Sequence, residues 1–280
     1  MSGRIVVFTN GNYFSRLILE RLMVQHSGDI SAVILVSADY GNRSGLARVI
    51  HLARTTDPHY VGYLLFQIAT FAMLQRVFRA ATFDVARLAA RAGVLIAECR
   101  SVTSKPAMDL VRQTRPDLIV SVSCPQRIPR NLLDLARCGG INIHASALPR
   151  YAGLAPYFWV LSCGERETGI SAHYIADKVD SGNILVQRTL PIRPGMSAFA
   201  LFLDLAVLGQ GVLTEAVGLA LAKEPGLPQA LEQRSYRSHP SPPAYRALRR
   251  NGHVLMRLRE LIDACRREIA RGRRPFERLR

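Results

Sequence analysis

Asn142 and His144 stand two residues apart in the run Ile141–His144, which has the composition of a short strand. Side chains two apart on a strand point to the same face, so this pair is expected to share one surface. The amide of Asn142 offers two donors suited to an oxyanion, and the imidazole of His144 can exchange a proton near neutral pH. The pair is therefore a candidate centre for acid–base chemistry, although a histidine without partners more often has a structural role.

The residues around this pair form two extended motifs. The first is Asn142-x-His144-x-Ser146-x-Leu148-Pro149-x-Tyr151-x-Gly153. The second is Gly169-x-Ser171-x-His173, followed by Asp177 and then by Asp180-Ser181-Gly182-x-Ile184. In this order and separation the two motifs resemble the signature of the folate-dependent formyltransferases, a family that includes glycinamide ribonucleotide, methionyl-tRNA and sugar N-formyltransferases.

The resemblance implies a role for each of three residues. Asn142 would hold the oxyanion of a tetrahedral intermediate, and His144 would polarise the formyl oxygen or pass a proton. Asp180 would keep His144 charged and would relay the proton of the attacking amine. The chemistry agrees, because an amine that attacks a formyl carbon creates an oxyanion and an ammonium group, which need a donor and an acceptor.

The same resemblance names the donor and the residues beside it. The donor would be 10-formyltetrahydrofolate, and no metal ion is implied. Its pterin would lie against the loop Ser123–Pro129 and the second motif, with contacts from Cys124, Gln126, Arg127, Ile128, Asp177, Ser181 and Gly182. The acceptor would face the turn after the first strand and part of the first motif, with contacts from Asn10, Gly11, Asn12, Ser146 and Tyr151.

The cysteines give no sign of a metal site or of disulfide bonds. They are five in number and scattered, no pair has Cys-x-x-Cys spacing, and no Cys/His cluster has the spacing of zinc ligands. We interpret them as reduced thiols. The N-terminal residues lack the pattern of a secretory signal, so a cytoplasmic location is expected.

The elements that must position the candidate site alternate between apolar runs and helical periodicity. Arg4–Phe8 and Ile30–Val36 are expected to be strands on either side of a helix. Later strands are expected at Val94–Ala97, Asp117–Val122, Ile141–His144, Gly169–Ile175 and Ile184–Thr189, and helices near Ala107–Thr114, Arg130–Ala136 and Ser197–Lys223. The alternation predicts an α/β fold with a Rossmann-like, doubly wound, mostly parallel sheet and a basic helical C-terminal extension. No Gly-x-Gly-x-x-Gly follows the first strand, so a dinucleotide is not predicted.

The predicted domain organisation has three parts. Residues 1–224 would form the catalytic domain, with an apolar helical insert at about 44–80. Residues 225–243 contain five prolines and are interpreted as a linker. Residues 244–280 would form a basic helical tail.

The insert and the tail are unusual in composition. Tyr60–Leu74 contains no charged residue, which suits a buried helix or a contact between two copies of the chain; an interfacial membrane segment or a lid is the alternative. The net charge of +16 arises mainly near the C-terminus, because fourteen arginines and four acidic residues lie between Arg234 and Arg280. Such a tail suits nucleic acid, an anionic membrane surface or simply a solvated helix.

Together these features predict an N-formyltransferase that acts on a small amine, either an amino-sugar nucleotide or an intermediate of specialised metabolism. Methionyl-tRNA is the alternative acceptor, favoured by the arginines of the tail. A hydrolase that releases formate and a non-catalytic folate-binding relative are two further alternatives.

Overall fold

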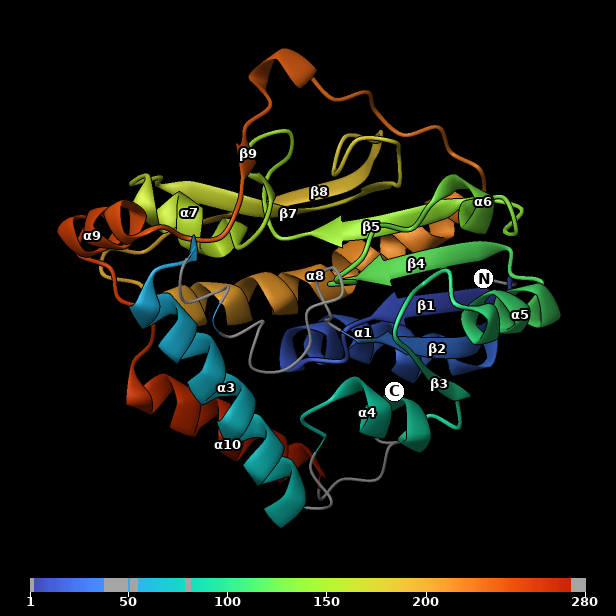
Figure 1. Ribbon diagram of the computed structural model, residues 1–280, viewed down its shortest axis with the longest axis horizontal. Coiled ribbons are helices and arrows are strands. Elements are labelled where there is room, and N and C mark those ends of the chain that lie inside the picture. Colours follow the sequence, from blue (N-terminus) through green and yellow to red (C-terminus); the bar gives the residue numbers. More distant parts are fainter. Residues whose placement is uncertain (1–2, 38–49, 51–54, 79–81, 273–280) are drawn as a thin grey trace.

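A seven-stranded sheet forms the centre of the molecule in a computed structural model, which describes residues 3–37, 50, 55–78 and 82–272 (Figure 1). The strands lie in the order β3-β2-β1-β4-β5-β7-β8. Their bounds are β1 Ile5–Thr9, β2 Ile30–Val36, β3 Ile96–Cys99, β4 Leu118–Val122, β5 Gly140–His144, β7 Glu167–Tyr174 and β8 Ile184–Pro191. Every strand that the sequence predicts is present, with ends shifted by a few residues at most.

The direction of the strands confirms a mostly parallel sheet. Strands β1 to β5 pair in parallel, whereas β7 is antiparallel to both β5 and β8. The strand order reverses between β1 and β4, and in open α/β sheets ligands bind beside the carboxyl ends of strands at such a reversal. Asn142 and His144 lie at the end of β5, next to that point.

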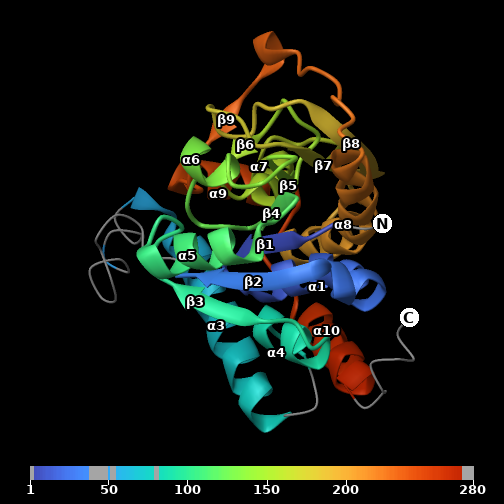
Figure 2. The same cartoon turned by 90° about the vertical axis from the view of Figure 1, so that its right-hand side faces the viewer.

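Helices cover both faces of the sheet, as Figure 2 shows. On one face Ile5 and Val7 pack with α1 and α8, while on the other Val6 and Phe8 pack with α5 and α6. This alternation along β1 explains why the strand is apolar throughout. The helices are α1 Tyr13–His26, α3 Pro58–Val77, α4 Val85–Arg91, α5 Lys105–Thr114, α6 Arg130–Leu133, α7 Pro156–Ser162, α8 Ala198–Leu221, α9 Pro242–Arg250 and α10 Leu258–Gly272.

The long helix α8 is a core element. By length and composition it could cross a membrane, but half of the residues in its most apolar stretch are buried inside the protein. A Cβ added at Gly209 would lie 2.8 Å from Ile170 Cδ1 and 3.2 Å from Ile18 Cγ1, so this glycine lets α8 approach both β7 and α1. The apolar run of this helix therefore reflects its contacts with the sheet and with α1.

The segment predicted as a linker has regular structure of its own. It carries the 3-10 helix η2 (Leu231–Gln233) and the short strand β9 (Tyr236–Arg237), which pairs with β6 (Ala152–Gly153). The tail is helical as predicted, and α9 and α10 bury Leu248 and Leu261 against the rest of the protein. Residues 38–49, 51–54 and 79–81 of the predicted insert region, and 273–280 of the tail, lie outside the described residues.

A buried arginine of α1 holds α10 in place. Arg16 is 1% exposed, and its guanidinium lies 3.0 Å from the carboxylates of both Glu20 and Glu268. Tyr13 also donates a hydrogen bond to Glu268. Burial raises the pKa of Glu268 above its ordinary value, and the charge of Arg16 opposes that rise. Arg16 therefore compensates the buried charge that the tail brings to the core.

We expect Arg16→Met to lower the free energy of unfolding by about 3–5 kcal/mol, because two buried carboxylates lose their main cation. Urea unfolding followed by circular dichroism measures the change. Arg21→Met is the matched control on the same helix, since Arg21 is exposed and donates a hydrogen bond to Gln25. A change within about 0.5 kcal/mol is expected there. Equal losses in the two variants would contradict the assigned role of Arg16.

Candidate active site

The register of the sheet brings the two sequence motifs together. Strands β5 and β7 are antiparallel, and Asn142 lies opposite His173 while His144 lies opposite Ser171. The chain then turns through the loop that carries Asp180. As a result the three residues predicted to be catalytic come together, with Asn142 and His144 each within contact distance of Asp180.

The orientation of the Asn142 amide follows from its partners. Its Oδ1 accepts a hydrogen bond of 2.8 Å from the hydroxyl of Ser121 on β4. Its Nδ2 lies 3.2 Å from His173 Nε2 and 3.4 Å from Asp180 Oδ1. Since a carboxylate only accepts, the nitrogen must face Asp180. The long Nδ2 contacts leave the amide able to donate to another oxygen nearby.

His144 is held at both ring nitrogens. Its Nε2 lies 2.9 Å from the carbonyl oxygen of Tyr151, so Nε2 carries a hydrogen, because a carbonyl only accepts. Its Nδ1 lies 3.5 Å from Asp180 Oδ2. When Nδ1 is protonated as well, the ring is an imidazolium paired with a carboxylate. The side chain is buried with its partners, so the pair is only weakly screened by solvent.

Asp180 is a buried carboxylate with several donors. It receives a 2.8 Å hydrogen bond from Gly153 N, and His173 Nε2 lies 3.5 Å from its Oδ1. Burial raises the pKa of Asp180, but the charge of His144, the hydrogen bond and charge of His173 and the Gly153 N–H together hold that pKa well below its ordinary value. Asp180 is therefore ionised at neutral pH and stabilises positive charge on His144.

His173 is a fourth member of this cluster and was not among the predicted catalytic residues. It is 2% exposed, and its Nδ1 donates to the carbonyl oxygen of Tyr174 at 2.7 Å. Its Nε2 faces both Asn142 and Asp180. The sequence signal was its place in the second motif, two residues after Ser171, and it supports the interpretation that His173 holds the other residues in position.

Ser146 and Tyr151 turn their side chains into the protein. Ser146 is fully buried and its hydroxyl donates to the carbonyl oxygen of Arg150 at 2.8 Å. The phenol of Tyr151 donates a hydrogen bond to Glu165 at 2.5 Å, while the main-chain oxygen of Tyr151 accepts a hydrogen bond from His144. Both residues shape the loop around His144, and their predicted contact with an acceptor stays a prediction.

The loop after β4 is joined to the Asp180 loop. Arg127 donates a hydrogen bond to the carbonyl oxygen of Asp177, so these two predicted residues lie side by side. Gln126 is bound elsewhere: its Nε2 donates to Arg100 O at 2.7 Å and its Oε1 accepts from Val102 N at 3.1 Å. The side chain of Gln126 therefore holds its own loop in place, and any contact of this residue with a ligand would be made by its main chain.

The other predicted donor-side residues are closely packed. Ile128 is 7% exposed and belongs to the core, and burial raises the pKa of the Cys124 thiol to about 11. Ser181 donates to Lys178 O at 2.9 Å. A Cβ at Gly182 would lie 2.0 Å from Tyr174 O, so only glycine fits there. Together these contacts make a surface on which the main chain, more than the side chains, would meet a ligand.

The turn after β1 satisfies its own side-chain oxygens. Asn10 Oδ1 accepts from Asn12 N at 3.1 Å, and Asn12 Oδ1 caps α1 by accepting from Ser15 N at 2.9 Å. Gly11 has a φ of 74°, a left-handed conformation that glycine adopts without strain. The turn lies at the carboxyl end of β1, two strands from Asn142, as the prediction of an acceptor side requires.

Residues 229–237, which we call the strap, hold both loops of the site. Gln229 Nε2 donates to the main-chain oxygens of Asp180 at 3.0 Å and Gly182 at 2.6 Å. Further along the strap, Ser235 Oγ accepts from Tyr151 N at 2.9 Å, and Arg237 O accepts from Leu154 N at 2.8 Å. No sequence signal marks these contacts, because a proline-rich polar stretch has the composition of a linker.

Asp180 depends on this support. Its φ of 53° is left-handed, which costs a residue other than glycine about 1 kcal/mol or more. Arg234 donates a hydrogen bond of 2.9 Å to the carbonyl oxygen of Val179, the residue before Asp180. The strap thus fixes the peptide groups on either side of a strained residue.

We expect Gln229→Ala to raise the rate of amide hydrogen exchange in residues 176–184 by about tenfold, because two hydrogen bonds to that loop are lost. Mass spectrometry of deuterated peptides measures the rate. Gln233→Ala is the matched control, since Gln233 is an exposed glutamine of the same strap. Unchanged exchange in Gln229→Ala would show that the strap does not hold the Asp180 loop.

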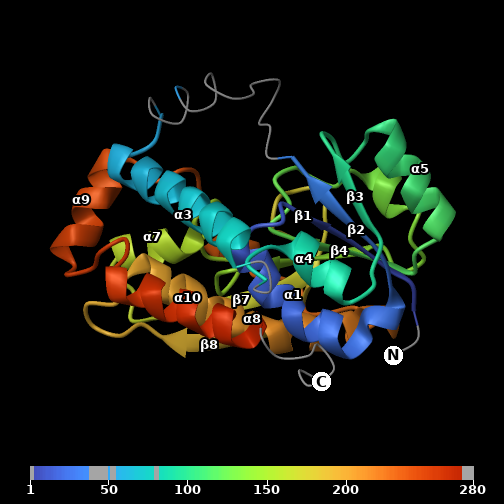
Figure 3. The same cartoon turned by 90° about the horizontal axis from the view of Figure 1, so that it is seen from below.

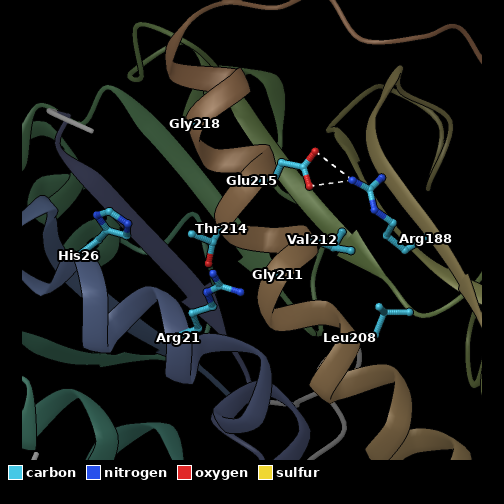
Figure 4. A pocket seen from close by; sticks show the side chains of 9 residues that line it. All are labelled: Arg21, His26, Arg188, Leu208, Gly211, Val212, Thr214, Glu215 and Gly218. Atoms are coloured by element: carbon cyan, nitrogen blue, oxygen red, sulfur yellow. Dashed lines mark hydrogen bonds and ion pairs between the residues drawn. The ribbon is translucent and has the colours of Figure 1, made fainter. Parts of the chain in front are cut away.

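A separate cavity of about 550 Å³ lies between α1, α8 and β8 (Figure 4). Arg188 and Glu215 form an ion pair of 3.0 Å on one side of it, and Arg21 and His26 line the other side. Its lining shares no residue with the cluster around Asp180. Within the described residues no group of His, Cys, Asp and Glu could hold a metal ion.

Similarities to known proteins are consistent with this geometry. The formyl transferase family model matches residues 3–217. Methionyl-tRNA formyltransferases of Geobacter sulfurreducens and Enterococcus faecalis are 44% and 33% identical over 43% and 54% of this chain. The matched regions span only 38% and 49% of those two relatives.

Two solved structures are similar in fold. The phosphoribosylglycinamide formyltransferase of Anaplasma phagocytophilum has a TM-score of 0.56 at 16% identity, covering 85% of this chain and 99% of its own. A likely sugar N-formyltransferase of Mycobacterium tuberculosis has a TM-score of 0.53 at 18% identity, covering 84% and 75%. The family match spans most of the chain, and the cluster of Asn142, His144 and Asp180 lies inside it. The chain belongs to the formyl transferase family.

Proposed function

We propose that this protein is an N-formyltransferase that moves a formyl group from 10-formyltetrahydrofolate to an amine. The observation that supports this most directly is the joint placement of Asn142, His144 and the ionised Asp180 at one strand end. Transfer requires a new bond between the amine nitrogen and the formyl carbon, loss of one amine proton, and protonation of the folate nitrogen that leaves. A donor, a cation and a carboxylate suffice for these steps without a covalent enzyme nucleophile.

Each residue has a distinct part in this chemistry. Asn142 Nδ2 exchanges its 3.4 Å contact with Asp180 for a shorter hydrogen bond to the oxygen that gains negative charge. The imidazolium of His144 adds positive charge beside the same oxygen. Asp180 balances that imidazolium and relays the amine proton, directly or through a water molecule, to the folate nitrogen as the bond between that nitrogen and the formyl carbon breaks. His173 holds Asn142 and Asp180 at the distances that these steps need.

The loops beside the cluster fit a folate. The bound folate supplies the activated formyl group. The Arg127–Asp177 hydrogen bond brings together the two loops that the sequence predicts to hold its pterin. The side chains of Gln126 and Ile128 are already bound within the protein, and Gly182 leaves no space for a side chain. A flat pterin ring would therefore meet mostly main-chain N–H and C=O groups, which suit its edge of amide-like donors and acceptors.

For the acceptor we propose a small amine, such as an amino-sugar nucleotide. The oxygens of Asn10 and Asn12 are engaged within their turn, so the amide N–H groups are the polar atoms these side chains can offer. Such donors suit an acceptor with phosphate or hydroxyl oxygens. Two proteins of similar fold support this choice: the likely sugar N-formyltransferase of Mycobacterium tuberculosis, and an N-formyltransferase of Helicobacter canadensis solved with folinic acid and dTDP-3-aminofucose.

Methionyl-tRNA is the second candidate acceptor. The curated relatives carry that name, and the arginines near the C-terminus suit an anionic partner. However, the matched region spans less than half the length of those relatives, and helices α9 and α10 pack back on the rest of the protein. Formate release with water as the acceptor would use the same donor and is an outcome of the test below.

The test is turnover of 10-formyltetrahydrofolate by the purified protein with a panel of amines. We expect formylated product and free tetrahydrofolate in equal amounts with amino-sugar nucleotides, and little product with methionyl-tRNA. Free folate and formate without an acylated amine would instead assign a hydrolase. The absence of both products would contradict the proposed activity.

We expect Asn142→Ala to lower kcat by roughly 100- to 1,000-fold, because one aimed donor contributes about 2.7–4 kcal/mol to stabilisation of an oxyanion. KM for the folate should change far less, since the donor acts on charge that develops during the reaction. Asn131→Ala, an exposed asparagine of α6, is the control and should retain full activity. A loss confined to KM would remove the oxyanion role from Asn142.

A further inference from the structure

Two features of the chain have no part in the proposed reaction: the apolar helix α3 and the arginines of α10. They are far apart in the sequence, yet both helices lie on the lower face of the molecule in Figures 1 and 3. Tyr13 of α1 contacts both, because its ring lies 4.4 Å from that of Phe71 and its hydroxyl bonds to Glu268. A single surface therefore contains both features.

The two sides of α3 differ in what they contact. On the inner side Tyr60 bonds to Tyr157 at 2.8 Å, and Tyr63 and Phe71 pack into the core. At 100° per residue the outer residues fall on the opposite half of the helix. These are Leu65 (47% exposed), Phe66 (47%), Ile68 (66%), Met73 (57%) and Val77 (64%). Large apolar side chains are thus exposed over the outward half of α3, as is typical of a binding surface, and we call these five residues the apolar row.

On α10 the acidic residues mostly face inward and the arginines outward. Glu268 is buried against Arg16, and Glu260 bonds to Ser197 and Arg257. Arg259, Arg266 and Arg267 are exposed, together with Leu258 and Ile262. Asp263 is the exposed acidic residue of the described part of this helix. The outward face of α10 is thus basic as well as partly apolar.

We propose that the α3–α10 face binds peripherally to an anionic lipid bilayer. The outer side chains of α3 would enter the boundary between headgroups and acyl chains, and the arginines of α10 would lie at the level of the lipid phosphates. The inner side of α3 stays packed on the protein, so the helix lies on the membrane and does not cross it. This proposal does not depend on the identity of the transferred group or of the acceptor.

Charge and apolar character together favour this partner over two others. Nucleic acid would bind the arginines but gains little from exposed Ile68 and Met73, because it recognises proteins mainly through charge and aromatic stacking. A second copy of the chain would cover the apolar row but would bring the arginines of two α10 helices towards each other. An anionic bilayer matches both the apolar row and the positive charge.

The test is co-sedimentation of the full chain with vesicles of phosphatidylcholine alone or of phosphatidylcholine with phosphatidylglycerol. We expect binding to the anionic vesicles that weakens as salt is raised. The double variant Ile68→Glu/Met73→Glu should bind at least about tenfold more weakly, and Arg266→Ala/Arg267→Ala should lose a similar factor. Circular dichroism checks that each variant is folded.

Matched controls separate this face from general surface effects. Val207→Glu/Leu227→Glu replaces two exposed apolar residues of other elements, and Lys105→Ala/Arg112→Ala removes two positive charges from α5. Both controls should bind the anionic vesicles as the parent chain does. Equal losses in test and control variants, or no binding to anionic vesicles, would overturn the proposal.

Two further measurements address the other partners. Binding to tRNA that depends on Arg266 and Arg267 but not on Ile68 and Met73, without vesicle binding, would assign the face to nucleic acid. A dimer in sedimentation velocity that dissociates in Ile68→Glu/Met73→Glu would make the face a contact between subunits. Either result would overturn the membrane proposal.

Discussion

The site depends on one buried negative charge, the carboxylate of Asp180. A carboxylate that is 9% exposed is stable in its ionised form only if donors replace the water it has lost. Here the donors come from three places: His144 and Asn142 on β5, His173 on β7, and the main chain at Gly153. The pairing register of β5 and β7 thus sets where the donors lie around the carboxylate. Asp180 can stay ionised only because the fold brings these donors together.

The sheet alone does not complete this arrangement. Asp180 has a left-handed backbone outside the strands, and Gly153 lies in β6, which pairs with β9 of the strap, so neither is set by pairing within the seven-stranded sheet. The strap fixes both, and it continues directly into α9 and α10. Because α10 is anchored by the ion pair between Arg16 and Glu268, the C-terminal helices that follow the strap are held to the core. A segment that has the composition of a linker and a tail is therefore part of the support of the site.

The contrast between what could and could not be predicted has a physical basis. The strands and the Asn142–His144 pair could be predicted, because period-two burial and the chemistry of side chains are local properties of the sequence. The roles of two other residues could not be predicted, for different reasons. His173 contacts Asn142 and Asp180 because of the pairing register of β5 and β7, which only the folded sheet reveals. Gln229 donates to main-chain oxygens, to which any suitable donor could bind. The absence of charge in Tyr60–Leu74 is visible in the sequence. Which side of α3 is exposed is not, because that depends on the contacts of α3 with Tyr13 and Tyr157 in the folded protein.

The chemistry of the cluster constrains the donor more than the acceptor. In the proposed reaction Asn142, His144 and Asp180 act on the formyl carbon of the donor and on an amine nitrogen, and this pair of atoms is the same for every acceptor. Discrimination between acceptors must therefore come from the surrounding elements, since only they contact the rest of the molecule that carries the amine. In this chain one such element is the turn after β1, whose asparagine oxygens are already bonded. The turn leads directly into Tyr13 of α1, whose ring packs against Phe71 of α3, so the proposed acceptor side and the proposed membrane face are joined through one residue.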